Sequence, residues 1–365
     1  MADPTVRSAP PARALAQPWL GLIALAAVVA VSLAFIALQP WPLFRDWVSY
    51  VAVCGVPFLF VIGPVWHAEQ PPAIGRLPQP ARGLAFVALD LAVAVLAALV
   101  IGFAVGGGLV PPPPNAAHVA IMAVPFTFGL AVVWDGWPFR LLRRPVAAGL
   151  LLMVAAFVLS WLTYRLFANY SAFAGGPAYV AALDPRGPFD VWLVLTFVVT
   201  AMAVTLLWLQ LGLWPVPPSV LSSPVARGGV LTLGVAAVTA IALGVGVGVA
   251  HLTAAAFLAQ VTVPFLFGSI LLLNIVEGRV PLPAAQPVRG LASAAVSAVA
   301  GLALAALYVA LLPVVSGPIA FGAPGFQGEV WVASAMLGVT FPLLAVLADC
   351  FAFWPLRREP GDAAR

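Results

Sequence analysis

The sequence predicts an all-α, polytopic integral membrane protein of about ten transmembrane helices, arranged as five repeated helical hairpins. Three observations support this fold class: 63% of the 365 residues are hydrophobic, only 8% are charged, and two sequence segments recur at one fixed offset. The mean hydropathy is +1.10. A soluble domain with this composition would expose large apolar surfaces to water, so a soluble fold is excluded.

Apolar stretches of roughly 20 residues, the length that crosses about 30 Å of hydrocarbon, occur ten times. They lie at 18–39, 47–67, 82–106, 117–138, 146–168, 190–213, 229–251, 256–277, 290–312 and 330–354. We therefore expect a single transmembrane domain over residues 18–355, with an N-terminal tail at 1–17 and a C-terminal tail at 356–365. The first stretch lacks a small-residue cleavage site, so we expect a retained helix and not a signal peptide.

The basic residues predict the orientation. All 16 are arginines, and 13 fall on one side of the predicted membrane, at positions 7, 13, 76, 82, 140, 143, 144, 227, 279, 289, 357, 358 and 365. By the positive-inside rule both termini are cytoplasmic, which requires an even number of spans, and we expect the cell inner membrane. Because the basic excess is explained by topology, nucleic acid is not an expected partner.

Two segments repeat at an offset of 207 residues. Val56–Phe60 (VPFLF) returns unchanged as Val263–Phe267, and QPARGLA at 79–85 returns as QPVRGLA at 286–292. Both offsets are equal, since 263 − 56 and 286 − 79 are each 207. An ungapped recurrence of this kind predicts a duplicated structural unit. We expect residues 47–106 to be related to residues 256–312, each containing a helical hairpin.

Prolines mark the even-numbered spans. Four of these spans carry one near the middle, at Pro57, Pro125, Pro264 and Pro342, and the sixth span has Met202 instead. A proline within a helix removes a backbone hydrogen bond and kinks the helix. The freed carbonyl then needs a partner in protein or in a water-lined cavity. Two interpretations stay open: packing kinks copied by duplication, or a ring of kinks around a central solute site near the midplane.

One carboxylate falls well inside a predicted span. Asp90 lies seven residues after Gly83, roughly 10 Å into the third span at 1.5 Å per residue. The position 207 residues later is Ser297, so the two could face each other across a pseudo-twofold axis. Ionisable residues inside membranes are costly and mark functional sites. Asp90 is thus a candidate proton site, and a structural Asp bonded to a neighbouring helix is the alternative.

Further polar residues gather near the ends of the spans. Those on the arginine-rich side are Asp135, Asn274, Glu277 and Asp349, and Arg165 closes the fifth span on the other side. Groups near an interface reach water, so a solvated rim is one interpretation. The other is a gate of ion pairs that involves Arg76, Arg140 or Arg279.

Tryptophans and one long connection lie at the predicted membrane surfaces. Trp66 and Trp331 are among the tryptophans near span ends, which is typical of an interfacial aromatic belt. The connection between spans five and six carries Asp184, Arg186 and Asp190. It is either an ordinary ordered loop or a partial cover over a vestibule.

Signatures of catalysis are missing from the sequence. The three histidines, at 67, 118 and 251, are not at metal-ligand spacing, and there is no GxSxG, P-loop or CxxC motif. Cys54 and Cys350 both fall within spans. We therefore expect no metal, cofactor or catalytic residue, and an enzyme is disfavoured.

The combination favours a permease for a small neutral or amphiphilic solute, with Asp90 as a proton-coupling residue. Its expected partners are the lipid bilayer and that solute. A second hypothesis is a non-catalytic, membrane-embedded subunit or assembly factor that binds partner membrane subunits. A third is a lipid-modifying enzyme, which would need a polar cluster that opens toward the bilayer.

Overall fold

The computed structural model describes residues 15, 17–108, 112–174, 179–276, 284–323 and 325–357. Within these ranges ten helical stretches are long and apolar enough to cross a membrane. Each coincides with one of the predicted spans, so the count of ten is confirmed and the chain is a multi-pass membrane protein. The tails predicted at 1–17 and 356–365 lie almost wholly outside the described residues.

The odd-numbered spans are the more regular helices. They are α1 (Trp19–Ala37), α5 (Ala81–Ala104), α7 (Pro145–Phe167), α10 (Pro224–Leu243) with the π-helical turn η7 (Gly244–Val249), and α13 (Val288–Ser316).

The even-numbered spans are mostly composite. Span two is α2 (Trp41–Leu43), η1 (Phe44–Val48), α3 (Ser49–Phe60) and η2 (Val61–Val65); span four is α6 (Pro114–Phe128) and η3 (Gly129–Val133); span six is α8 (Val191–Gln210). Span eight is α11 (Ala254–Phe257), η8 (Leu258–Thr262), α12 (Val263–Ile270) and η9 (Leu271–Ile275); span ten is α14 (Gln327–Ala333), η10 (Ser334–Thr340), α15 (Phe341–Ala345) and η11 (Val346–Cys350).

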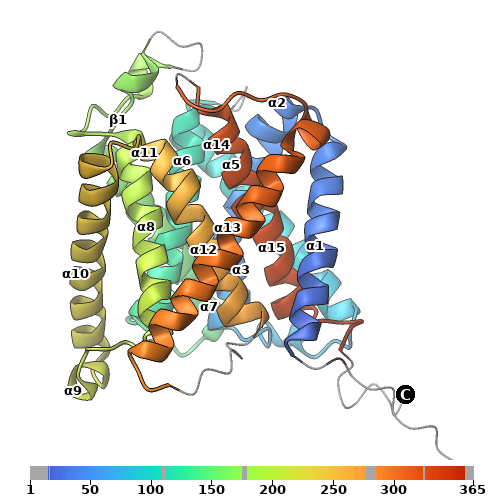
Figure 1. Ribbon diagram of the computed structural model, residues 1–365. Coiled ribbons are helices and arrows are strands. Elements are labelled where there is room, and N and C mark those ends of the chain that lie inside the picture. Colours follow the sequence, from blue (N-terminus) through green and yellow to red (C-terminus); the bar gives the residue numbers. More distant parts are fainter. Residues whose placement is uncertain are drawn as a thin grey trace, which may run out of the picture.

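Short elements connect the spans at the two ends of the bundle (Figure 1). We call one end the basic end, because the arginine-rich connections with α4 (Pro72–Gly75), η4 (Phe139–Leu141) and α9 (Pro218–Leu221) lie there. The other, which we call the distal end, holds η5 (Ser171–Phe173), η6 (Ala181–Leu183) and the parallel pair β1 (Ala168–Asn169) and β2 (Phe189–Asp190). That the basic end faces the cytoplasm stays a prediction.

Two spans begin five or six residues before their predicted starts. Span two begins at Trp41 and not at 47, and span seven begins at Pro224 and not at 229. In both cases a proline, Pro42 or Pro224, stands in the first helical turn. Proline has the helical φ already set, and the amide hydrogen that it lacks has no partner there anyway.

The even-numbered spans form a closed inner ring. In order around it, α3 packs on α6, α6 on α8, α8 on α12, α12 on η10, and η10 back on α3. The odd-numbered spans lie outside, and Figure 1 shows α10 and α1 at opposite edges of the bundle. Burial follows this arrangement: 72% of the most apolar window of span eight is buried, against 17% for span nine. Successive spans thus alternate between inner and outer helices.

Irregular backbone follows the prolines. The four ring spans with a central proline each contain π-helical turns, whereas α8, which has Met202 instead, is one continuous α-helix. π-Turns accommodate a local disruption of the i→i−4 ladder and are common at functional sites. The ring is therefore interrupted in four of its five members.

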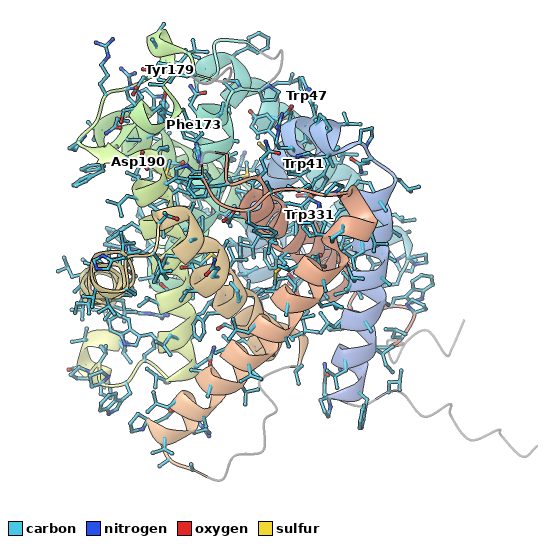
Figure 2. The ribbon with its side chains drawn as sticks, turned by 45° about the horizontal axis from the view of Figure 1, so that its top comes forward. Trp41, Trp47, Phe173, Tyr179, Asp190 and Trp331 are labelled. Atoms are coloured by element: carbon cyan, nitrogen blue, oxygen red, sulfur yellow. The ribbon has the colours of Figure 1, made fainter. Side chains whose placement is uncertain are left out.

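Two tryptophans expected in the interfacial belt are buried instead. Trp331 is 0% exposed and donates from Nε1 to Ser316 Oγ at 2.8 Å. Trp66 is 3% exposed and donates to the Pro145 carbonyl at 3.1 Å. Each indole thus fills apolar volume and satisfies its N–H within the protein. Figure 2 shows Trp331 within the bundle, below Trp41.

Candidate functional site

Aromatic side chains occupy the inside of the ring near the kinks. Phe60 lies between neighbours on both sides, with ring centroids 5.5 Å from Phe128 and 5.8 Å from Phe341. All three side chains are buried. Spans two, four and ten are thus joined by packed aromatic rings at this level, where a central solute site was one expectation.

A cavity lies on the outer side of the ring. It has a volume of about 650 Å³ and is lined by α6, η3, α7, α8 and α10. Pro125 and Met202 both line it, so it reaches the level of the kinks. Along α8 the lining extends from Leu193 to Thr205, a rise of roughly 18 Å at 1.5 Å per residue. The cavity is therefore long and runs along the helices.

This cavity opens sideways. Three of its lining side chains near the distal end are also exposed on the outside of the bundle: Leu159 by 37%, Phe167 by 46% and Phe189 by 48%. Leu159 and Phe167 belong to the membrane-spanning helix α7, so the medium around them is lipid, and Phe189 lies in β2 beyond the end of that span. An apolar molecule could therefore enter the cavity from the bilayer.

Polar groups in the cavity are few, and two of them meet at its basic end. Trp134 Nε1 donates to Thr232 Oγ1 at 3.1 Å, and both residues line the cavity. Nearby, Arg227 in the first turn of α10 donates from Nη2 to the Val132 carbonyl at 2.9 Å. The rest of the lining is almost entirely apolar. A long apolar space with a polar end is the shape expected for an amphiphile.

Asp90 lies on the opposite part of the ring, where α5 packs against α3. A Cβ built on Gly55 would lie 3.1 Å from Asp90 Oδ2, so the carboxyl group sits directly on the backbone of α3. Its Oδ1 is buried and has no hydrogen-bond partner among the described residues. Such a group is costly in an apolar medium, which is why it needs a role.

Ser297 has different neighbours from Asp90. It is 0% exposed on α13 and its hydroxyl donates to Gln210 Oε1 on α8 at 3.4 Å. Ser297 also lies on the backbone of α12, because its carbonyl group is directly beside Gly268. That Asp90 and Ser297 face each other across a pseudo-twofold axis stays a prediction.

The gate candidates are spread around both ends. Asp135 forms an ion pair with Arg140 in which the side chains are 51% and 44% exposed, as expected of a solvated rim. Asn274 and Asp349 are exposed at the basic end of spans eight and ten, and Arg165 is exposed in the last turn of α7. Glu277 and Arg279 lie outside the described residues.

The described part of the connection between spans five and six packs aromatic side chains together at the distal end. Phe173 stacks on Trp192 with centroids 6.2 Å apart, and Trp192 also contacts Phe326. His118 Nδ1 and the Tyr170 hydroxyl are 2.9 Å apart. Burial raises the pKa of Tyr170 well above its usual value, so its hydroxyl stays neutral. Figure 2 shows Phe173 and Tyr179 at the distal end of the molecule.

A glutamine motif, the Gln-Pro start of the two repeated segments, has a third copy and a structural role, neither of which was predicted. Three outer helices begin with Gln-Pro-x-x-Gly, in which the glutamine accepts from the glycine N–H four residues on and donates to the carbonyl at the end of a ring span. The pairs are Gln17 with Ile275, Gln79 with Cys350, and Gln286 with Gln210, at 2.9, 2.8 and 3.1 Å. The recurrence of QPWLG at 17–21 was the missed signal.

Within the described part of the chain, no group of three or more His, Cys, Asp or Glu side chains could hold a metal ion. Comparisons with protein-family models, with curated proteins and with solved structures gave no match.

Proposed function

We propose that this protein is a membrane permease for an amphiphilic solute, whose apolar part occupies the cavity between α6, α7, α8 and α10. The observation that carries the proposal is the cavity itself: about 650 Å³, elongated, apolar and reached from the bilayer. Its volume falls within the range of small-molecule sites, roughly 300–1,000 Å³. The polar group of the solute would lie at the basic end, near Trp134 and Thr232.

The size of the cavity favours a small molecule. The volume of about 650 Å³ lies in the middle of the range for small-molecule sites. The lipid-modifying enzyme is weakened, because no carboxylate, histidine or cysteine is among the lining residues.

Filling the cavity tests the proposal. Ala236 lines it on α10, whereas Ala237, the next residue, does not line it and is exposed. We expect Ala236→Phe to weaken binding of a fluorescent polyene fatty acid by roughly tenfold or more, equivalent to about 1.4 kcal/mol, because the new ring takes the place of the apolar chain. Binding is measured by fluorescence titration of the detergent-purified protein, and uptake in proteoliposomes.

Ala237→Phe is the matched control, since the same substitution then points away from the cavity; we expect it to bind the probe within twofold of the wild type. Equal losses in both variants, or no loss in either, would exclude the cavity as the site. A stoichiometric membrane subunit that co-purifies and is displaced by Ala236→Phe would favour the subunit hypothesis.

A further inference from the structure

Two carboxylates lie along one helix of the inner ring, each directly on a glycine. Asp90 contacts Gly55 on α3, as described above. At the basic end, a Cβ built on Gly63 in η2 would lie 2.8 Å from Asp349 Cγ. Gly55 and Gly63 are eight residues apart, which is about 12 Å along the helix. The glycines leave room for both carboxyl groups on the same span.

The two carboxylates differ in their access to water. Asp349 lies in the last turn of span ten, where the residue as a whole is exposed and its carboxyl group packs on Gly63, whereas Asp90 Oδ1 is buried without a hydrogen-bond partner in the described part of the chain. Cys350, buried next to Asp349 in the sequence, lies close enough to both carboxylates to interact with them electrostatically. The pair thus leads from the aqueous surface into the bundle.

Other titratable groups on the packed elements are already engaged or remote. Tyr50 on α3 donates to the Ala98 carbonyl at 2.8 Å, and Cys54 is a buried thiol on the same helix. His118 on α6 pairs with Tyr170 at the distal end. Arg82, in the first turn of α5, also interacts with Cys350 and has a contact of its own. Asp90 is the innermost acid in this group.

The chemistry of the pair suits a proton and not a metal ion. Calcium takes six to eight oxygen ligands and magnesium six, and the described residues offer no such cluster around either carboxylate. A single carboxyl group on a glycine can hold one proton and needs no further ligand.

We propose that Asp349 and Asp90 form a proton path that connects the aqueous phase at the basic end to the interior of the bundle. Hydronium gives its proton to the Asp349 carboxylate and leaves as water. The proton then passes through water to Asp90 Oδ1, and Asp349 returns to its anionic form. No other reactant is needed, and the release of the proton follows the same steps in reverse.

This path lies between α5, η2 and η11, and the amphiphile cavity lies between α6, α7, α8 and α10. It therefore stands independently of the proposed function. Its test below uses no solute, so failure of one proposal leaves the other in place.

The test follows protonation of Asp90 by infrared spectroscopy on the full chain in proteoliposomes. After a pH jump, we expect a C=O stretching band of a protonated carboxyl group that is present in the wild type and missing in Asp90→Asn. In Asp349→Asn we expect the band to change at least roughly tenfold more slowly, which corresponds to about 1.4 kcal/mol of barrier. Gly63→Ala, which displaces the Asp349 carboxyl group, should slow it as well.

Asp135→Asn is the matched control, because Asp135 is also at the basic end but pairs with Arg140. It should leave the rate within twofold of the wild type. A band that survives in Asp90→Asn, or equal rates in Asp349→Asn and Asp135→Asn, would overturn the path. Labelling of Asp90 by a hydrophobic carbodiimide, measured by mass spectrometry, checks that the variant proteins are folded around this side chain. The label should still be found on Asp90 in Asp349→Asn. Loss of the label there would also overturn the assignment.

Discussion

Gly301→Ala is expected to destabilise the protein by about 2–3 kcal/mol, within the range for overpacked interiors. On α13, a Cβ at this position would collide with the Pro264 carbonyl oxygen of α12, and Gly268 on α12 is equally close to the Ser297 carbonyl. In both cases the atom that the new Cβ would meet is a backbone carbonyl oxygen, which cannot rotate away as a side chain could. The two helices would have to separate, and small residues at such an interface are what allow close approach in membranes.

The control for this prediction is Gly229→Ala on α10, where an added Cβ meets nothing within 4 Å. Replacing glycine by alanine within a helix raises helix propensity by up to about 1 kcal/mol, so this variant should be as stable as the wild type or more stable. The two substitutions are identical and differ only in their surroundings. Thermal unfolding in detergent, followed by intrinsic fluorescence, should show a lower unfolding temperature than the wild type for Gly301→Ala and an equal or higher one for Gly229→Ala. A Gly301→Ala protein at least as stable as Gly229→Ala would refute the close packing.

Gln286→Leu is expected to cost about 2–6 kcal/mol, the sum of two polar groups left without partners at about 1–3 kcal/mol each. The Gln286 side chain accepts from Gly290 N–H at 3.0 Å and donates to the Gln210 carbonyl at 3.1 Å. It thus satisfies the first turn of α13 and the last turn of α8 together. Leucine keeps a similar volume but can replace neither bond. Gln79→Leu should act alike, since Gln79 joins α5 to the Cys350 carbonyl.

Gln39→Leu is the matched control for these variants. Gln39 is half-buried and makes one hydrogen bond in the described part of the chain, an exposed one from Nε2 to the Phe35 carbonyl of its own helix at 3.2 Å, so it joins no second helix. Its loss should change stability by less than about 0.5 kcal/mol. The same unfolding assay measures all three proteins. If Gln286→Leu and Gln39→Leu unfold together, the glutamine motif does not join the two layers of helices.

The fold was predictable to the level of its elements. The ten spans follow from hydropathy, because a fixed hydrocarbon thickness demands a fixed length of apolar helix. The inner ring was not predictable in the same way. Lipid is as apolar as the protein interior, so no difference in polarity distinguishes the buried face of a span such as α12 from the exposed face of α13. The regular alternation of inner and outer helices appears only in the packing.

The candidate site was less predictable than the fold. Asp90 was identifiable because a charge within an apolar run is rare, and its place beside Gly55 agrees with a buried role. Its association with Asp349 depends on the contact between spans three and ten. The two residues are 259 positions apart in the sequence, 349 − 90. The cavity between α6, α7, α8 and α10 had no sequence signal, because its lining is apolar like the helices around it. Only a local failure of close packing creates it.

The sequence by itself determined the class of the protein, the number and rough bounds of its spans, and the presence of kinks at the prolines. These depend on short-range properties: apolar length, the missing amide hydrogen of proline, and arginines too costly to bury. The tertiary structure alone decided which helices form the ring, which tryptophans are buried, and where a cavity opens to the bilayer. Those features depend on contacts between distant segments, and in a membrane such contacts are selected by shape and hydrogen bonding and not by polarity.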